Sequence, residues 1–194
     1  MQSILNGKKL ILSSGSPRRQ ELLENSGLIP HDKRVKEIDE SFSDDMDVSQ
    51  VASFLAREKA MAFDTIADDE VYLTADTVVI HNGKIYGKPK DRQDAIDTLT
   101  TLANEEHTVV TGVCLRSSTE TYIFDDVSRV KIAAMNQEEI EYYIDNYSPF
   151  DKAGSYGIQD WLGICKVEYI YGSYSNIMGL PMQKVYEELR EFCG

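Results

Sequence analysis

Residues 9–27 of the chain read KLILSSGSPRRQELLENSG, and this stretch decides the class of fold. The apolar run at residues 9–12 predicts a buried strand, because short continuous apolar segments are typical of strands covered on both faces. A polar serine–glycine turn follows, and a helix is expected to begin at Pro17, since proline suits the first helical turn and Ser16 suits the N-cap. Gly27 suits the end of that helix. A strand, a loop and a helix in this order indicate an α/β protein.

The rest of the chain continues the alternation of strands and helices. Asn82–Gly83 lies between two apolar arms and predicts a tight hairpin over residues 77–87. Further strands are expected at 71–75, 107–116, 121–125, 127–133 and 166–170, helices at 48–66, 91–102, 136–147 and 181–192, and a loop region at 148–163. Because no linker-like tract divides the sequence, residues 1–194 are expected to form a single domain with a mixed sheet.

The charge balance limits the possible partners. The formal net charge is −13 at pH 7, which repels nucleic acids and anionic membranes. The apolar segments are shorter than a membrane span, and the N-terminus lacks the pattern of a signal peptide. The 3 cysteines lie far apart without CxxC spacing, which indicates a reducing compartment. We therefore expect a cytoplasmic protein without a nucleic-acid or membrane partner. An anionic substrate would need a local cluster of cations, a divalent metal ion, or both.

The serine–glycine turn at residues 13–16 is a candidate anion-binding loop. A loop between a strand and a helix N-terminus points backbone N–H groups, hydroxyls and the positive end of the helix dipole at one place. Arg18 and Arg19 lie in the first turn of the same helix, where the dipole disfavours cations unless an anion is held nearby. Two solvated arginines on a surface turn are the alternative.

Acidic and basic side chains elsewhere add further candidates. Asp76 follows the apolar strand at 71–75, and carboxylates at strand ends in α/β sheets are frequent catalytic and metal-binding residues. An aspartate that only turns the backbone is the alternative. Asp39–Glu40 is a second acidic pair, for which solvent exposure is by itself the better explanation. A solvated surface position is also a strong alternative for each of the lysines, Lys59, Lys88 and Lys152. The distribution of the cations is more informative, because they recur at loops and helix starts beside glycine and serine.

Aromatic residues and histidines give weaker signals. Trp161 is the only tryptophan and could stack on a base, although core packing is the better expectation. His31, His81 and His107 are scattered without ligand spacing, so we assign them no role. The sequence contains no GxxxxGK[ST] loop, no GxGxxG motif and no credible catalytic triad.

Taken together, these segments resemble the Maf family, in its subgroup of dTTP/UTP pyrophosphatases. The resemblance lies in LILSSGSPRRQELLENSG, IDESF, AREKA, TADTVVIHNGKIYGKP, DAIDTLTTL, HTVVTGV, PFDKAGSYGIQDW and YIYGSYSNIMGLPM. These motifs cover nearly the whole chain in the fitting order, and their combination is specific. One stretch, residues 29–36, departs from the family pattern because it is unusually basic.

The resemblance implies an α/β/α architecture with an elongated, twisted mixed β-sheet and a cleft between two lobes. It implies hydrolysis of a nucleoside triphosphate to the monophosphate and pyrophosphate with Mg²⁺, Mn²⁺ or a similar divalent cation. It also hints at a homodimer.

The resemblance further implies roles for individual residues. Ser14, Ser16, Arg18 and Arg19 would form the phosphate-binding loop, and Lys59, Lys88 and Lys152 would make the remaining phosphate contacts. Glu40 and Asp76 would be the acidic residues of the site, and Asp76 would accept a proton, hold the metal, or do both. Arg18, Thr77 and Gln159 would set the substrate preference, in a combination that resembles the pyrimidine group.

Three alternatives remain open from the sequence. Two are related enzymes, a 7-methyl-GTP pyrophosphatase and an inosine or xanthosine triphosphate pyrophosphatase of similar architecture. The third is a non-catalytic regulator of septum formation that binds a protein partner.

Overall fold

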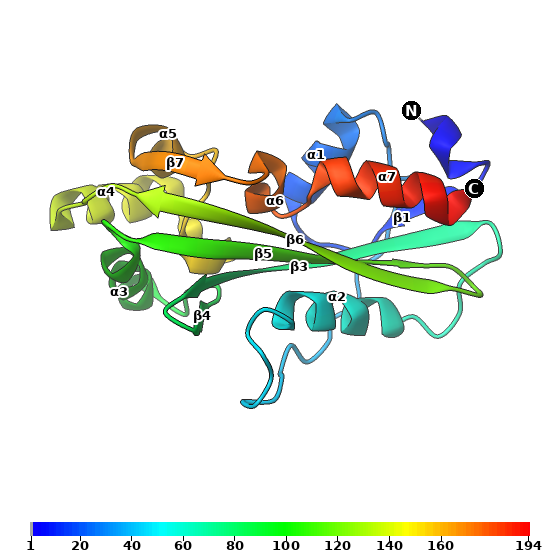
Figure 1. The fold of residues 1–194 in the computed structure, drawn as a ribbon, viewed down its shortest axis with the longest axis horizontal. Coiled ribbons are helices and arrows are strands. Elements are labelled where there is room, and N and C mark those ends of the chain that lie inside the picture. The colour runs from blue at the N-terminus through cyan, green and yellow to red at the C-terminus, as the bar shows by residue number, and fades with distance from the viewer. Residues whose placement is uncertain (1) are drawn as a thin grey trace. The chain divides into compact units, whose positions relative to one another are not determined.

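The computed structural model describes residues 2–194 and shows a mixed α/β fold (Figure 1). The strands are β1 (Lys9–Leu12), β2 (Asp32–Lys33), β3 (Glu70–His81), β4 (Lys84–Tyr86), β5 (Glu106–Arg116), β6 (Thr121–Ile132) and β7 (Val167–Tyr171). The α-helices are α1 (Pro17–Asn25), α2 (Val51–Met61), α3 (Arg92–Leu102), α4 (Gln137–Tyr147), α5 (Trp161–Cys165), α6 (Tyr174–Met178) and α7 (Met182–Cys193). Short 3₁₀ helices are η1 (Gln2–Leu5), η2 (Pro149–Asp151) and η3 (Ala153–Ser155). Among residues 2–194, no helix is long and apolar enough to cross a membrane.

The sheet is mixed, as the sequence predicted. Its strand order is β2-β1-β3-β5-β6-β7, with β4 paired to β3. β1 runs parallel to both β2 and β3, whereas the β3–β4 and β6–β7 pairs are antiparallel. The chain forms two compact units. The first comprises the chain up to Asp76, Thr111–Asp126 and Gly179–Gly194, and the second comprises Thr77–Val110 and Val127–Met178. The single-domain organisation expected from the sequence stays a prediction.

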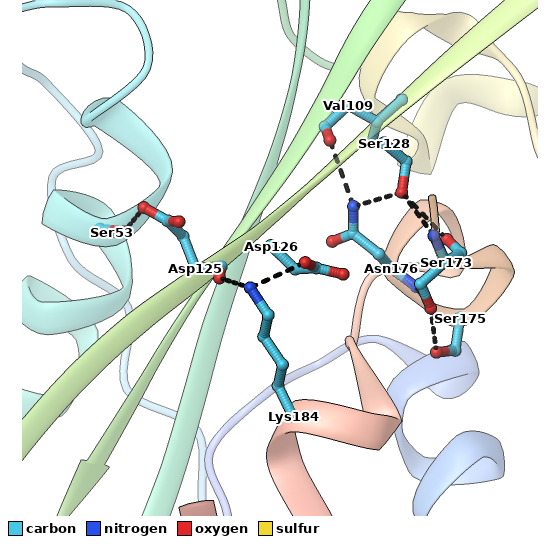
Figure 2. Close-up of polar contacts among 9 residues, drawn as sticks. All are labelled: Ser53, Val109, Asp125, Asp126, Ser128, Ser173, Ser175, Asn176 and Lys184. Atoms are coloured by element: carbon cyan, nitrogen blue, oxygen red, sulfur yellow. Dashed lines mark hydrogen bonds and ion pairs between the residues drawn. The ribbon is translucent and has the colours of Figure 1, made fainter. Parts of the chain in front are cut away.

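The core of the first unit forms on both faces of its strands. Leu10 and Leu12 of β1 pack with Leu23 of α1 and with Val185 and Leu189 of α7 on one face. α2 covers the opposite face (Figure 1). Polar contacts add to this packing, because Lys184 of α7 pairs with Asp126 at 2.9 Å and donates to the Asp125 carbonyl at 2.8 Å (Figure 2). The first unit is therefore layered as α/β/α.

Gly112 of β5 allows α2 to approach the strand closely. A Cβ atom at this position would lie 2.3 Å from the Ser53 nitrogen and 2.4 Å from the Ala52 carbonyl carbon, both in the α2 backbone. We expect Gly112→Ala to lower the free energy of unfolding by about 1–3 kcal/mol, because a backbone contact of this kind cannot relax by a change of rotamer. Denaturant unfolding checks this, with Gly87→Ala as the control, since that glycine has nothing within 4 Å of its Cβ position. Equal stability of the two variants would contradict the close packing of α2.

The second unit is built around α3 and α4. Leu99 of α3, Val130 of β6 and Ile144 of α4 belong to one buried cluster. A polar network holds α6, in which Asn176 donates to the Val109 carbonyl at 3.2 Å and to Ser128 Oγ at 2.9 Å (Figure 2). This network satisfies the two amide N–H donors of Asn176, whose side chain is fully buried.

The helices predicted at 91–102 and 136–147 are confirmed, and each begins at a side-chain cap. Asp91 accepts a hydrogen bond from the Asp94 N–H at 2.9 Å, and Asn136 and Glu139 form a capping box. Several boundaries were predicted wrongly. The helix predicted at 48–66 covers only Val51–Met61, and the two strands predicted at 121–125 and 127–133 are the single strand β6. The region predicted as a loop at 148–163 contains two short 3₁₀ helices and the start of α5.

Asp76 was predicted to stand at the end of a strand, and this is wrong. β3 continues without interruption through Asp76 to His81. Residues 77–80 read TVVI, a run of β-branched side chains that favours an extended strand. The carboxylate is tolerated inside the strand because an ammonium group from α2 pairs with it.

Candidate active site

The serine–glycine loop lies between β1 and α1, as the sequence predicted. Ser14 is buried, and its Oγ atom accepts hydrogen bonds from the Ser16 N–H at 3.2 Å and from Arg19 Nη1 at 3.1 Å. Ser16 takes the N-cap position, but its side chain makes no cap hydrogen bond within residues 2–194. Pro17 occupies the first helical turn, so the loop leads directly into the N-terminus of α1. The loop thus gathers hydroxyls and N–H groups at the positive end of a helix dipole.

Arg19 is fixed on both sides of its guanidinium group. Nε donates to the Gly179 carbonyl at 2.6 Å, and Nη1 donates to Ser14 Oγ. Gly179 has φ of 111°, a conformation that favours glycine, so the backbone turn that presents this carbonyl depends on the residue type. Burial lowers the pKa of Arg19, and the negative charges of Asp76 and Glu40 oppose that effect. Arg19 therefore links the loop electrostatically to the two acidic residues.

Lys59 of α2 joins the acidic residues predicted for the site. Its Nζ atom forms ion pairs with Asp76 Oδ1 and, at 2.9 Å, with Glu40 Oε1. The side chains of Lys59 and Asp76 are 17% and 14% exposed, whereas Glu40 is 48% exposed. The Lys59 ammonium thus lies between two carboxylates and forms a charged cluster with them in the first unit. The structure thus brings together three residues that the sequence had placed about 20 positions apart.

The same carboxylates are suited to a divalent cation. Mg²⁺ is commonly held by one or two carboxylates, with water and substrate phosphates as its remaining ligands. Asp76 and Glu40 already face one cationic group, the Lys59 ammonium. Among residues 2–194, no group of three or more His, Cys, Asp or Glu side chains is placed to hold a metal ion. Asp76 and Glu40 therefore fit a divalent cation as two carboxylate ligands.

Arg18 lies half-buried in the first turn of α1, whereas Lys88 and Lys152 lie in the second unit. Lys88 is exposed in the segment after β4, and Gly87 before it accepts a hydrogen bond from the Gly154 N–H at 3.1 Å. Lys152 is buried, and its ammonium lies 2.8 Å from Asp151 Oδ1. Gly154 has φ of 68° and approaches Val79 so closely that a Cβ would lie 2.8 Å from a methyl carbon. The loop that carries Lys152 is therefore packed tightly against β3 and beside the segment that carries Lys88.

Thr77 and Gln159 are the positions that the resemblance connects with substrate preference. Thr77 follows Asp76 directly in β3. Gln159 lies between η3 and α5, and its buried Oε1 atom has no hydrogen-bond partner among the described residues. A buried carbonyl oxygen without a partner costs free energy, so it is suited to accept a hydrogen bond from a ligand.

His107 and Trp161 make structural contacts in the second unit. His107 Nε2 lies 2.7 Å from Tyr156 Oη, and burial lowers the pKa of His107 to about 4, so the ring is neutral near pH 7. This contact supports the segment between Lys152 and Gln159. Trp161 packs on Tyr142 with ring centroids 5.3 Å apart, which confirms the prediction of core packing.

A pocket in the first unit does not match the predicted substrate. Its lining comprises Glu120, Tyr122, Glu188, Glu191 and Phe192. Three carboxylates repel a polyphosphate, so we do not assign this pocket to nucleotide binding.

Sequence reasoning missed three residues around the predicted ones. They are Gly179, whose carbonyl holds Arg19, and Tyr143 and Asp160, which hydrogen-bond to each other near Lys152. Gly179 and Asp160 lie within motifs that the sequence analysis quoted, but their contacts depend on tertiary structure.

Comparisons with known proteins agree with the resemblance. The family described as Maf-like protein matches residues 9–192. The chain is 46% identical over 192 residues to a dTTP/UTP pyrophosphatase of Bacteroides fragilis, covering 98% of this chain and 100% of the relative. It is 45% identical over 179 residues to a protein of the same name from Flavobacterium psychrophilum, covering 92% of this chain and 91% of the relative. A third such protein, from Porphyromonas gingivalis, is 44% identical over 187 residues, covering 95% of this chain and 94% of the relative. The family match and the relatives cover nearly the whole chain, and the serine–glycine loop with Arg19 and the carboxylates paired by Lys59 lie within the matched residues. The chain therefore belongs to the Maf family.

Proposed function

We propose that the protein hydrolyses dTTP, UTP and related pyrimidine nucleoside triphosphates to the monophosphate and pyrophosphate. The observation that carries the proposal is the cluster of Ser14, Arg19, Lys59, Asp76 and Glu40 in the first unit. Relatives that the chain matches over nearly their whole length have the name dTTP/UTP pyrophosphatase. Cys114, Cys165 and Cys193 are free, as expected in a reducing compartment, so we place the activity in the cytoplasm.

The cationic side chains would offset the charge of the substrate. A triphosphate brings about three or four negative charges, which arginines, lysines and a divalent ion together can balance. Ser14, Ser16, Arg18 and Arg19 would hold phosphate oxygens at the N-terminus of α1. Lys59, Lys88 and Lys152 would make further phosphate contacts. A net charge of −13 over the whole chain makes such local gathering of cations necessary.

Asp76 would act on the water that attacks the substrate. The water oxygen forms a bond to the α-phosphorus, the bond between that phosphorus and the bridging oxygen breaks, and pyrophosphate leaves. Asp76 would orient this water and accept its proton. Lys59 lies against the same carboxylate and would hold it in place. A bound Mg²⁺ or Mn²⁺, held by Asp76 and Glu40, would stabilise the negative charge on the phosphates.

A panel of nucleotides tests the proposal. Pyrophosphate release would be measured from dTTP, UTP, 7-methyl-GTP, ITP and XTP, with Mg²⁺ or Mn²⁺ and again with a chelator. We expect the highest kcat/KM for the two pyrimidine nucleotides and loss of turnover with the chelator. A preference for 7-methyl-GTP, ITP or XTP would identify one of the related enzymes instead. Absence of pyrophosphate from every nucleotide would contradict the catalytic function and favour the non-catalytic regulator.

The substrate preference leads to a prediction for Gln159. Uracil and thymine present both an N–H donor and carbonyl acceptors, which a carboxamide can match and an ionised carboxylate cannot. We expect Gln159→Glu to lower kcat/KM for UTP and dTTP by about tenfold or more. The carboxylate keeps the buried acceptor Oε1 but loses the N–H donor of the carboxamide. Gln137→Glu, an exposed change of the same kind in the first turn of α4, is the control. An unchanged ranking of nucleotides in Gln159→Glu would contradict the assignment.

A further inference from the structure

Lys152 lies among carboxylates that restrict its position. Its side chain is 11% exposed, and Nζ lies 2.8 Å from Asp151 Oδ1 and 3.8 Å from Asp160 Oδ2. Asp151 is 53% exposed and adjacent in sequence, whereas Asp160 is 17% exposed and comes from the start of α5. An ion pair with a largely buried carboxylate is screened less by solvent than one with an exposed carboxylate. Asp160 is therefore the partner that can define where the Lys152 ammonium lies.

Asp160 is itself held by Tyr143. The Tyr143 hydroxyl donates to Asp160 Oδ2 at 3.0 Å and accepts from the Gly157 N–H at 2.9 Å. Tyr143 is fully buried in α4, and burial raises its pKa, so the hydroxyl keeps its proton and remains a donor. The Tyr143 ring stacks on Tyr147 with centroids 5.3 Å apart, which fixes the direction of the hydroxyl.

Gly157 completes a tightly packed arrangement. A Cβ at this position would lie 2.5 Å from Asp160 Oδ2 and 3.1 Å from Lys152 Cε. The backbone at Gly157 thus touches both members of the ion pair. The Tyr143 hydroxyl therefore ties the Asp160 carboxylate to the backbone of the loop that carries Gln159.

We propose that Asp160 is a positioning residue which, anchored by the Tyr143 hydroxyl, fixes the position of the Lys152 ammonium and thereby its contact with a phosphate. The inference rests on the proposed function, because Lys152 is a phosphate contact only if the protein binds a triphosphate. Asp160 acts through Lys152 and makes no contact with the substrate. Correct placement of a charged group is worth much in catalysis, since misplacement by about 1 Å can cost about 100-fold in rate.

A double-mutant cycle on kcat/KM for UTP tests the proposal. We expect Asp160→Asn to lower kcat/KM about tenfold in the wild-type background, because the amide still accepts from Tyr143 but no longer attracts the ammonium. In a Lys152→Met background, Asp160→Asn should change kcat/KM by less than about twofold. Tyr143→Phe, which removes only the hydroxyl, should also lower kcat/KM in the wild-type background. In the Lys152→Met background, Tyr143→Phe should leave kcat/KM nearly unchanged. Equal losses in the two backgrounds would show a merely structural role and overturn the proposal.

A second measurement does not depend on turnover. The rate at which an amine-reactive reagent acylates Lys152 would be followed by mass spectrometry, without nucleotide, in protein shown to be folded by its thermal transition. We expect faster labelling of Lys152 in Asp160→Asn than in the wild type, because the lysine can then turn outward. Labelling of Lys90, an exposed lysine of the same unit, should stay constant. Equal labelling of Lys152 in both proteins would overturn the positioning role. Absence of pyrophosphate release from the wild type would instead refute the proposed function, so the two failures are distinguishable.

Discussion

Asp76→Asn is expected to reduce kcat for UTP by about 10²–10⁴-fold, the usual contribution of a general base. The asparagine retains the size of the side chain and one oxygen, but it can neither accept a proton at neutral pH nor supply an anionic metal ligand. The Lys59 ammonium would keep Glu40 as its ionic partner, so the local structure should persist. Nucleotide binding should change little, because the loop from Ser14 to Arg19 remains intact.

Steady-state kinetics and calorimetric titration with UTP separate these effects for Asp76→Asn. Asp45→Asn, an exposed change in the same unit, is the control and should leave both quantities unchanged. Loss of UTP binding together with normal residual turnover would contradict the catalytic role of Asp76.

Arg19→Lys is expected to lower kcat/KM for UTP by about 10²-fold, the cost of losing a well-placed donor to developing charge. Lysine keeps the positive charge, but it lacks the planar fork with which Arg19 binds Ser14 Oγ and the Gly179 carbonyl simultaneously. The replacement should therefore disturb the Ser14 hydroxyl as well as the charge. A loss mainly in kcat would indicate that these groups act in the transition state.

The matched control for Arg19→Lys is Arg57→Lys, in which the arginine is 45% exposed and pairs with the neighbouring Glu58. This exposed pair should contribute little, so the control should retain full activity. Full activity in Arg19→Lys as well would show that charge alone is sufficient and would contradict the role of the fixed guanidinium.

The phosphate loop was the most predictable part of the site. Pro17 indicates where the helix begins, and arginines placed against the helix dipole indicate a bound anion. Both signals depend only on local geometry. The mixed sheet and the Maf family could also be predicted, because the segments and motifs that indicate them are continuous in sequence. Caps such as the Asn136–Glu139 box also depend on local spacing alone.

The position of Asp76 within its strand could not be predicted from local sequence. An aspartate after an apolar run is usually a strand terminator, yet here β3 continues because Lys59 neutralises the carboxylate. That lysine lies 17 positions earlier, on another element. The contacts of Gly179 with Arg19 and of Tyr143 with Asp160 likewise connect distant positions, so only the folded chain reveals them.

The basic stretch at residues 29–36 has a structural explanation. Arg34 pairs with Glu70 and Asp32, each at 2.8 Å, and donates to Tyr72 Oη at 2.7 Å. Glu70 is buried, so this arginine satisfies a carboxylate at the start of β3. The departure from the family pattern thus concerns the packing of the first unit, and Glu40 still reaches Lys59.

Hydrolysis of UTP in ¹⁸O-labelled water, followed by mass spectrometry of the products, tests the central claim most directly. Attack of water on the α-phosphorus, assisted by Asp76, places the label in UMP and leaves the pyrophosphate unlabelled. We predict this pattern for the wild type and its near disappearance in Asp76→Asn. Label in the pyrophosphate, or release of UDP and inorganic phosphate, would contradict cleavage of the α–β bond by attack at the α-phosphorus.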